Sequence, residues 1–181
     1  MSRSTGIRLA AVGVALGLLA PIAALAQSRA HAARKIERGK YLVMIAGCHD
    51  CHTPGGLYGA PDMSRALAGS EVGWQGPWGV SYGRNLTPDP ETGIGKWSEA
   101  DIVRTLRTGS RPDRTPLLPP MPWPNVAHMT DADLGAVAAY LKSLPPVKHA
   151  VPASVAPGGQ PAGAVIPFPP PPAWDAPRAS Q

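Results

Sequence analysis

The chain has 181 residues, with 17 Lys or Arg against 12 Asp or Glu. This length accommodates one domain of ordinary size with extensions. The modest positive charge forms no basic stripe, so the sequence does not indicate a nucleic-acid-binding protein. Only two cysteines are present, so at most one internal disulfide could form.

The first 26 residues have the pattern of an export signal. Two arginines precede an apolar stretch over residues 9–19, and Ala24-Leu25-Ala26 supplies a small-x-small site. This pattern predicts a signal peptide at 1–26, cleaved before Gln27. The alternative is an uncleaved membrane anchor, but the apolar run is shorter than the ~20 residues of a spanning helix. After cleavage we expect no transmembrane segment, and the remaining chain carries a net charge of +3.

A short linker is predicted at 27–33, followed by a domain over 34–146. Its first helix is expected at about 34–46, where apolar residues recur with an imperfect helical period. Residues 53–96 are rich in glycine and proline and show no sustained period. A loop of that length is unusual in a compact domain unless it wraps around something.

Two further helices are predicted from residues that are typical of helix ends. The second begins after Ser98 as N-cap, with Asp101 at the capping-box position, and ends at Gly109. A proline-rich loop over 110–128 follows. The third helix begins after Thr130 and is stopped by the proline at 145.

Residues 147–181 are rich in Pro, Ala and Gly and contain few apolar groups. They predict a disordered tail with polyproline II character. The remaining three helices and two long loops supply few apolar contacts for a domain of this size. The sequence therefore predicts an all-α domain whose loops wrap around a large bound cofactor.

The residues Cys48-His49-Asp50-Cys51-His52 form a Cys-x-x-Cys-His motif, which is the attachment signal for c-type haem. Two thiols add to the two vinyl groups on one porphyrin edge, and two intervening residues let the chain arch over that edge. The adjacent histidine then reaches the iron from the proximal side. The motif predicts one covalent haem c on Cys48 and Cys51, with His52 as proximal ligand.

Other uses of the two cysteines fit the sequence less well. A structural zinc site needs four ligands at defined spacing, and the chain has no further cysteine, while His31, His128 and His149 are scattered. A thioredoxin-type redox pair expects a βαβ setting. A disulfide across two residues would close a small, strained loop.

The sixth iron ligand is expected to be a methionine, a common partner of histidine. Met121 lies between prolines that fix the backbone and cannot continue a helix. Met129 precedes the N-cap Thr130 and could form a hydrophobic staple with the third helix. The sequence favours Met121 as distal ligand and leaves Met129, Met63, His128 or an open site as alternatives.

Several segments resemble class I c-type cytochromes, and more narrowly one haem domain of the cytochrome c subunits of bacterial membrane-bound alcohol and sugar-acid dehydrogenases. They are spread over most of the range 36–147 and are Gly39 to Leu42, Cys48 to Pro54, Asn85 to Asp89, Thr92 to Trp97, Met121 to Trp123, and Asp133 to Leu141. The resemblance implies the class I cytochrome c fold, a close crossing of the first and last helices at Gly39 and Tyr140, and Met121 as distal ligand. Such subunits carry several haem motifs and reach the membrane, whereas this chain has one motif and a proline-rich C-terminal stretch.

The sequence thus predicts an electron carrier rather than an enzyme. We expect it in the periplasm, free or peripherally associated with the inner membrane, passing single electrons from a dehydrogenase to the respiratory chain. Two alternatives remain: a tightly bound cytochrome subunit of a periplasmic dehydrogenase, or a ligand-binding haem sensor or peroxidase-like protein. Arg84, Asn85 and Trp97 are candidates for hydrogen bonds to haem propionates, and Arg104, Arg107 and Arg111 for a basic docking patch.

Overall fold

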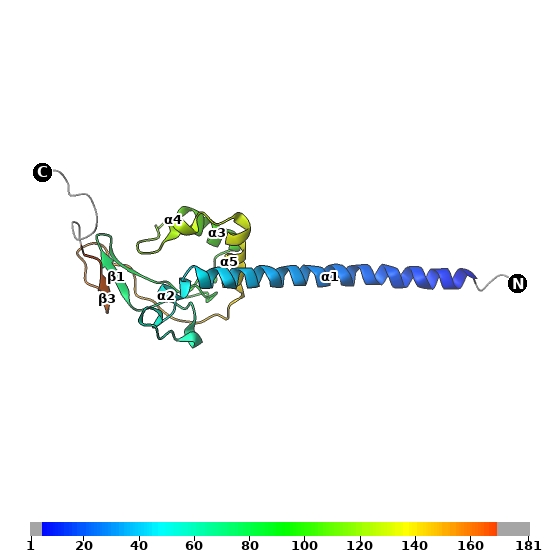
Figure 1. Cartoon of the computed structure of the whole chain (residues 1–181), viewed down its shortest axis with the longest axis horizontal. Coiled ribbons are helices and arrows are strands. Elements are labelled where there is room, and N and C mark those ends of the chain that lie inside the picture. Colours follow the sequence, from blue (N-terminus) through cyan, green and yellow to red (C-terminus); the bar gives the residue numbers. More distant parts are fainter. Residues whose placement is uncertain (1–4, 170–181) are drawn as a thin grey trace.

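The computed structural model describes the backbone of residues 5–169 and the side chains of residues 24–169. Helix α1 (Thr5–Ile45) is one continuous helix, and its N-terminal part projects away from the rest of the protein (Figure 1). The predicted linker at 27–33 is helical. Residues 22–38 contain six alanines and neither glycine nor proline, which explains why the helix continues through them. Within the described part of the chain, no helix combines the length and the apolarity needed to cross a membrane.

The second and third predicted helices are confirmed with their caps. Helix α3 (Glu99–Thr108) begins with a reciprocal capping box between Ser98 and Asp101, and Gly109 ends it at a φ of 67°. Helix α5 (Asp131–Ser143) begins with the Thr130 side chain accepting a hydrogen bond from the Asp133 N–H. Between them lies the short helix α4 (Trp123–Val126), inside the segment predicted as a loop.

The core lies where α1, α3 and α5 meet. Helix α1 packs against α5, and α3 packs against both α5 and α4. The main cluster of buried apolar residues comprises Leu42, Val43, Leu67, Ile94, Ile102, Ala136, Val137, Ala138 and Leu141. At the α1–α5 crossing, a Cβ on Gly39 would overlap the Ala136 carbonyl and lie 2.7 Å from the Cβ of Tyr140. The resemblance had implied this close approach.

A short helix and a small sheet occupy the long loop after α1. Helix α2 (Cys48–His52) holds the Cys-x-x-Cys-His motif, and the 3₁₀ turns η1 (Gly56–Tyr58) and η2 (Met63–Arg65) follow. Strand β1 (Gly73–Gly76) pairs antiparallel with β2 (Gly79–Tyr82) and parallel with β3 (Val165–Pro167), in the order β2-β1-β3. The sequence predicted no strands in these segments.

Strand β3 belongs to the segment predicted as a disordered tail. Residues 147–169 instead follow a defined path across the domain and end beside β1 (Figure 1). Their backbone is held by side chains from the loop over 84–92, as described below, so few apolar groups are needed to fix them. The remaining tail residues, 170–181, lie outside the described residues.

Candidate functional site

Helix α2 places the side chains of the Cys-x-x-Cys-His motif at one cavity. Gly47, at the N-terminus of α2, has a φ of 65° and turns the chain sharply from the end of α1 into the motif. Cys48, Cys51 and His52 all line a cavity of about 990 Å³. Most of the side chains that line it are apolar. Those from α1, α3, α5 and the intervening loops include Leu42, Val43, Ile94, Ile102, Leu106, Val137 and Leu141.

The histidine of the motif is held in one protonation state. The Nδ1 of His52 lies 2.7 Å from the backbone carbonyl oxygen of Arg84. Because a carbonyl only accepts hydrogen bonds, Nδ1 carries the proton and donates it, and Nε2 keeps its lone pair. Burial lowers the pKa of His52, which also favours the neutral ring. A neutral imidazole whose other nitrogen is bound to a carbonyl is the usual form of a metal-binding histidine.

The two cysteines lie in an environment that keeps them as thiols. Both are free in the structure and half-buried. Burial raises the pKa of Cys48 to about 11 and also raises the pKa of Cys51. Cysteines of redox-active pairs have lowered pKa values. The raised pKa values therefore leave both side chains uncharged in this apolar setting, and thioethers, which have no proton to lose, would also be uncharged there.

Two of the four methionines with described side chains line the cavity, and these are Met121 and Met129. Met44 and Met63 are each 56% exposed and are not among the lining residues. His128 is also exposed and is not a lining residue. Of the four side chains that the sequence offers as sixth ligand, Met121 and Met129 are the two that line the cavity.

The backbone constrains the two remaining methionines differently. The Met121 N–H donates to the Leu118 carbonyl at 3.2 Å, and Pro120 and Pro122 flank it. The Met129 carbonyl accepts a hydrogen bond from Arg107 Nη1 at 2.9 Å, and its side chain packs against the main apolar cluster. Met129 therefore packs against the core, although it also lines the cavity.

Two neighbouring arginines lie at the cavity. Arg84 and Arg111 both line it. The pKa of Arg111 is lowered, chiefly by burial and also by the positive charge of Arg84. Two neighbouring, partly buried guanidinium groups favour a bound anionic group, such as the carboxylates of a haem, while Asp113 at the same cavity offsets part of their charge.

The sequence candidates for propionate contacts have different roles in the structure. Arg84, Asn85 and Trp97 all line the cavity. The amide of Asn85 is already used, because it donates to Thr92 Oγ1 at 3.0 Å and to the Val147 carbonyl at 2.8 Å.

Two of the three arginines of the predicted basic patch are paired with acids. Arg104 pairs with Asp101, and Arg107 pairs with Asp131. Arg111 lies at the cavity, a position that no local sequence pattern indicated.

The cavity suits a haem in shape and chemistry. It is large and mainly apolar, with thiols and a neutral histidine from one short helix and methionine thioethers from the loop over 118–129. The hydroxyl of Thr105, which also lines it, is buried without a hydrogen-bond partner among the described residues. A zinc site built from His, Cys, Asp or Glu would require at least three such side chains close together. No such group is present among the described residues.

Comparison with known proteins identifies the family. The family model described as Cytochrome c matches residues 36–145. The chain belongs to the cytochrome c family. The expected fold class is therefore confirmed, with the small sheet as an addition. This cytochrome is an electron-transfer haem protein, and the family implies covalent haem c at the Cys48 and Cys51 spacing.

The relatives of this cytochrome include components of dehydrogenases. It is 36% identical over 135 residues to the cytochrome c subunit of the quinone-dependent alcohol dehydrogenase of Gluconobacter oxydans, covering 75% of this chain and 26% of the relative. It is 36% identical over 113 residues to the fructose dehydrogenase cytochrome subunit of Gluconobacter japonicus, covering 60% and 22%. It is 38% identical over 122 residues to one of the subunits of the nicotinate dehydrogenase of Pseudomonas putida, covering 67% and 10%. The cytochrome thus spans about a quarter or less of the length of these relatives.

Proposed function

We propose that this cytochrome carries one haem c, bound through Cys48 and Cys51 and ligated by His52 and Met121, and passes single electrons in the periplasm. The observation that carries the proposal is the cavity itself, to which both thiols, the imidazole and the Met121 thioether contribute. When bound, haem would supply one-electron chemistry at its iron.

The residues around the cavity have distinct roles in this proposal. The Arg84 carbonyl holds the His52 ring in the tautomer that leaves Nε2 for the iron. The prolines beside Met121 restrict the loop that presents its thioether. With His52 and Met121 both holding the iron, small molecules would have no free position on it. This arrangement is suited to electron transfer rather than to substrate binding.

The ligand assignment is tested by two matched substitutions, Met121→Leu and Met129→Leu. Each removes a thioether and nearly conserves the side-chain volume. We expect Met121→Leu to abolish the methionine-to-iron charge-transfer band of the oxidised protein, to lower the reduction potential and to allow carbon monoxide to bind the reduced protein at neutral pH. Met129→Leu should leave the spectrum intact. The opposite pattern would assign Met129, and carbon monoxide binding by the unaltered protein would indicate an open or displaceable sixth position.

We place this cytochrome between a periplasmic dehydrogenase and the respiratory chain. Support comes from the signal-like first 26 residues and from relatives named as dehydrogenase cytochrome subunits. Purified protein, reduced chemically, should be oxidised by membranes of a respiring bacterium, and a quinone-dependent dehydrogenase with its substrate should reduce it again. Failure of both exchanges would contradict a carrier role.

The second candidate is a tightly bound, non-catalytic subunit of a dehydrogenase, and the relatives that are themselves named as dehydrogenase subunits favour it. The two candidates differ in what accompanies the tagged protein through purification. A subunit should co-purify with a dehydrogenase at equal stoichiometry after a high-salt wash. A mobile carrier should be recovered alone.

A further inference from the structure

Residues 147–169, here called the strap, contribute to the wall of the haem cavity. Ala150, Val151, Ser154 and Phe168 line it. None of them belongs to the cysteine motif, the methionine loop or the three main helices. The strap therefore forms a separate side of the cavity, at the end where Arg84 lies.

The beginning of the strap is fixed to the loop that follows β2. Asn85 donates to the Val147 carbonyl at 2.8 Å, and the His149 N–H donates to Thr92 Oγ1 at 3.0 Å. Asn85 is 2% exposed, so this attachment is shielded from water. Hydrogen bonds to carbonyls and amides of the strap hold it without any requirement for apolar side chains.

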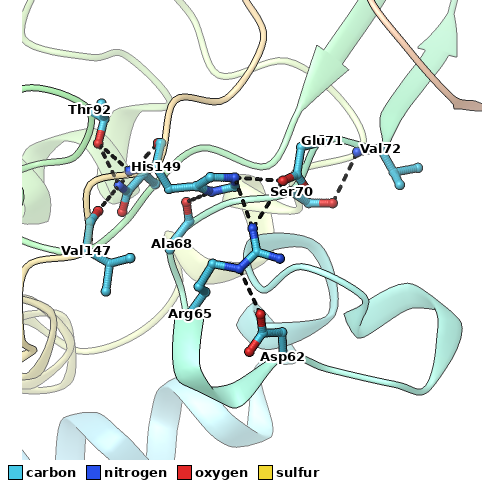
Figure 2. A network of polar contacts seen from close by, with 10 residues as sticks. Asp62, Arg65, Ala68, Ser70, Glu71, Val72, Thr92, Val147 and His149 are labelled. Atoms are coloured by element: carbon cyan, nitrogen blue, oxygen red, sulfur yellow. Dashed lines mark hydrogen bonds and ion pairs between the residues drawn. The ribbon is translucent and has the colours of Figure 1, made fainter.

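The ring of His149 forms a second attachment, shown in Figure 2. Its Nδ1 donates to the Ala68 carbonyl at 2.8 Å, and its Nε2 lies 2.7 Å from Glu71 Oε1. Arg65 joins the same group, with Nη1 3.3 Å from Glu71 Oε1 and Nε 2.8 Å from Asp62. The ring is thus held on two sides by a different loop from the one that binds the strap backbone.

The end of the strap is fixed to the sheet. Val155 and Val80 exchange backbone hydrogen bonds of 2.8 and 2.9 Å, and β3 pairs with β1. The Phe168 ring lies 5.8 Å from the ring of Trp74 and 5.4 Å from that of Trp78, both between ring centroids. The strap is therefore held at its beginning, at its middle and at its end.

Arg84 connects the strap to the proximal histidine. Its carbonyl accepts the hydrogen bond from His52, and its Nη1 donates to the carbonyls of Val151 and Pro152 at 3.3 and 2.9 Å. One residue thus joins the strap, the cavity and the proposed iron ligand. Movement of the strap would release the guanidinium and loosen the backbone that orients His52.

We infer that the strap is a built-in cover of the haem, which keeps water from the propionate end and positions Arg84, and thereby raises the reduction potential. This inference rests on the proposed function, since it requires haem in the cavity. Burial favours ferrous over ferric haem because the oxidised centre carries one more positive charge, which water and a higher dielectric stabilise. The strap is accordingly a positioning element that tunes the potential without touching the iron.

The test compares two shortened forms of the haem-loaded protein, one ending at Lys148 and one ending at Pro169. Both forms lose Asp175 and Arg178, and the additional segment 149–169 contains no Asp, Glu, Lys or Arg. The Asp, Glu, Lys and Arg side chains are therefore the same in both forms, and His149 is the one titratable side chain that only the shorter form loses. We expect the form ending at Lys148 to shift about tenfold toward the ferric state, a fall of about 59 mV for one electron. The form ending at Pro169 should match the full chain.

A milder pair of variants covers the case in which the short form does not fold. Phe168→Ala removes a ring that lines the cavity, and Tyr58→Ala removes one that is 65% exposed and outside it. Phe168→Ala should lower the potential by a smaller step than truncation and speed haem reduction by a water-soluble reductant, whereas Tyr58→Ala should change neither. An unchanged potential in Phe168→Ala and in the form ending at Lys148, where that form folds, would overturn the inference. Absence of covalent haem from the full chain would instead overturn the proposed function.

Discussion

Gly39→Ala places a methyl group where α1 and α5 cross. The new Cβ would overlap the carbonyl oxygen of Ala136 and lie 2.7 Å from the Cβ of Tyr140. The obstacle is backbone, so no rotamer change can relieve it, and the two helices must move apart. Core residues from both helices, including Leu42, Val43 and Val137, would lose part of their packing as a result.

The size of the effect follows from two opposing contributions. Overpacking by one methyl-sized group costs about 1–3 kcal/mol, and a backbone obstacle places this case at the upper end. Replacing glycine by alanine inside a helix returns about 1 kcal/mol. We therefore expect a net loss of about 2 kcal/mol, which is a fall in Tm of about 4–8 °C for a chain of this length.

Gly135→Ala is the matched control, because Gly135 lies on α5 close to the same crossing. Its added Cβ would find only Lys35 Cε within 4 Å, at 3.8 Å. This variant should gain about 1 kcal/mol from helix propensity alone. Thermal and urea unfolding of the haem-loaded proteins, followed by circular dichroism of the haem band, measures both. Equal stability of Gly39→Ala and the unaltered protein would refute the requirement for glycine at the crossing.

Three further outcomes are expected. Exported protein should begin at Gln27 by N-terminal sequencing, and an intact N-terminus on membrane-bound material would show an anchor instead. Ser98→Ala should cost about 1 kcal/mol in urea unfolding, since it removes half of the capping box of α3; no loss would mean that water replaces the cap. Hydrogen bonds from Ser64 and then Arg65 lower the pKa of Asp62 to about 2. Its contribution to stability is therefore fully present above about pH 4 and lost as the pH falls toward 2, so Asp62→Asn should flatten the acid limb of the stability profile; an unchanged limb would contradict this.

The two capped helices could be predicted from the sequence because their signals are local. Ser98 with Asp101, Gly109, and Thr130 with Asp133 act within one helical turn. The start of α1 could not be predicted in the same way. Alanine-rich sequence continues from the signal-like segment into the domain with no residue that ends a helix.

The path of the strap was the main feature that the sequence did not reveal. Its composition is that of a disordered segment, because it contributes few apolar groups of its own. What holds it lies elsewhere in the chain: Asn85 and Thr92 before α3, Glu71 near β1, and the edge of β1 itself. Such non-local hydrogen bonds leave no periodic pattern in the sequence.

The residues of the candidate site also divide into those with a local sequence signal and those without one. Cys48, Cys51 and His52 form a contiguous motif and were predicted directly, and the structure brings Met121 to the same cavity. Arg111 was assigned to a docking patch rather than to the cavity, and the cavity-lining residues of the strap were missed, since only the folded chain brings them to the cavity. A partly buried arginine in a loop has no sequence signature that separates it from an exposed one.

The electron-transfer role proposed for this cytochrome requires the covalent attachment of one haem to Cys48 and Cys51. Its most direct test is the intact mass of the exported protein after denaturation and acid–acetone extraction, measured for the unaltered chain and for the double variant Cys48→Ala with Cys51→Ala. We predict one haem retained per unaltered chain and none retained by the double variant. A haem-free mass for the unaltered chain, with haem recovered in the solvent, would contradict covalent attachment.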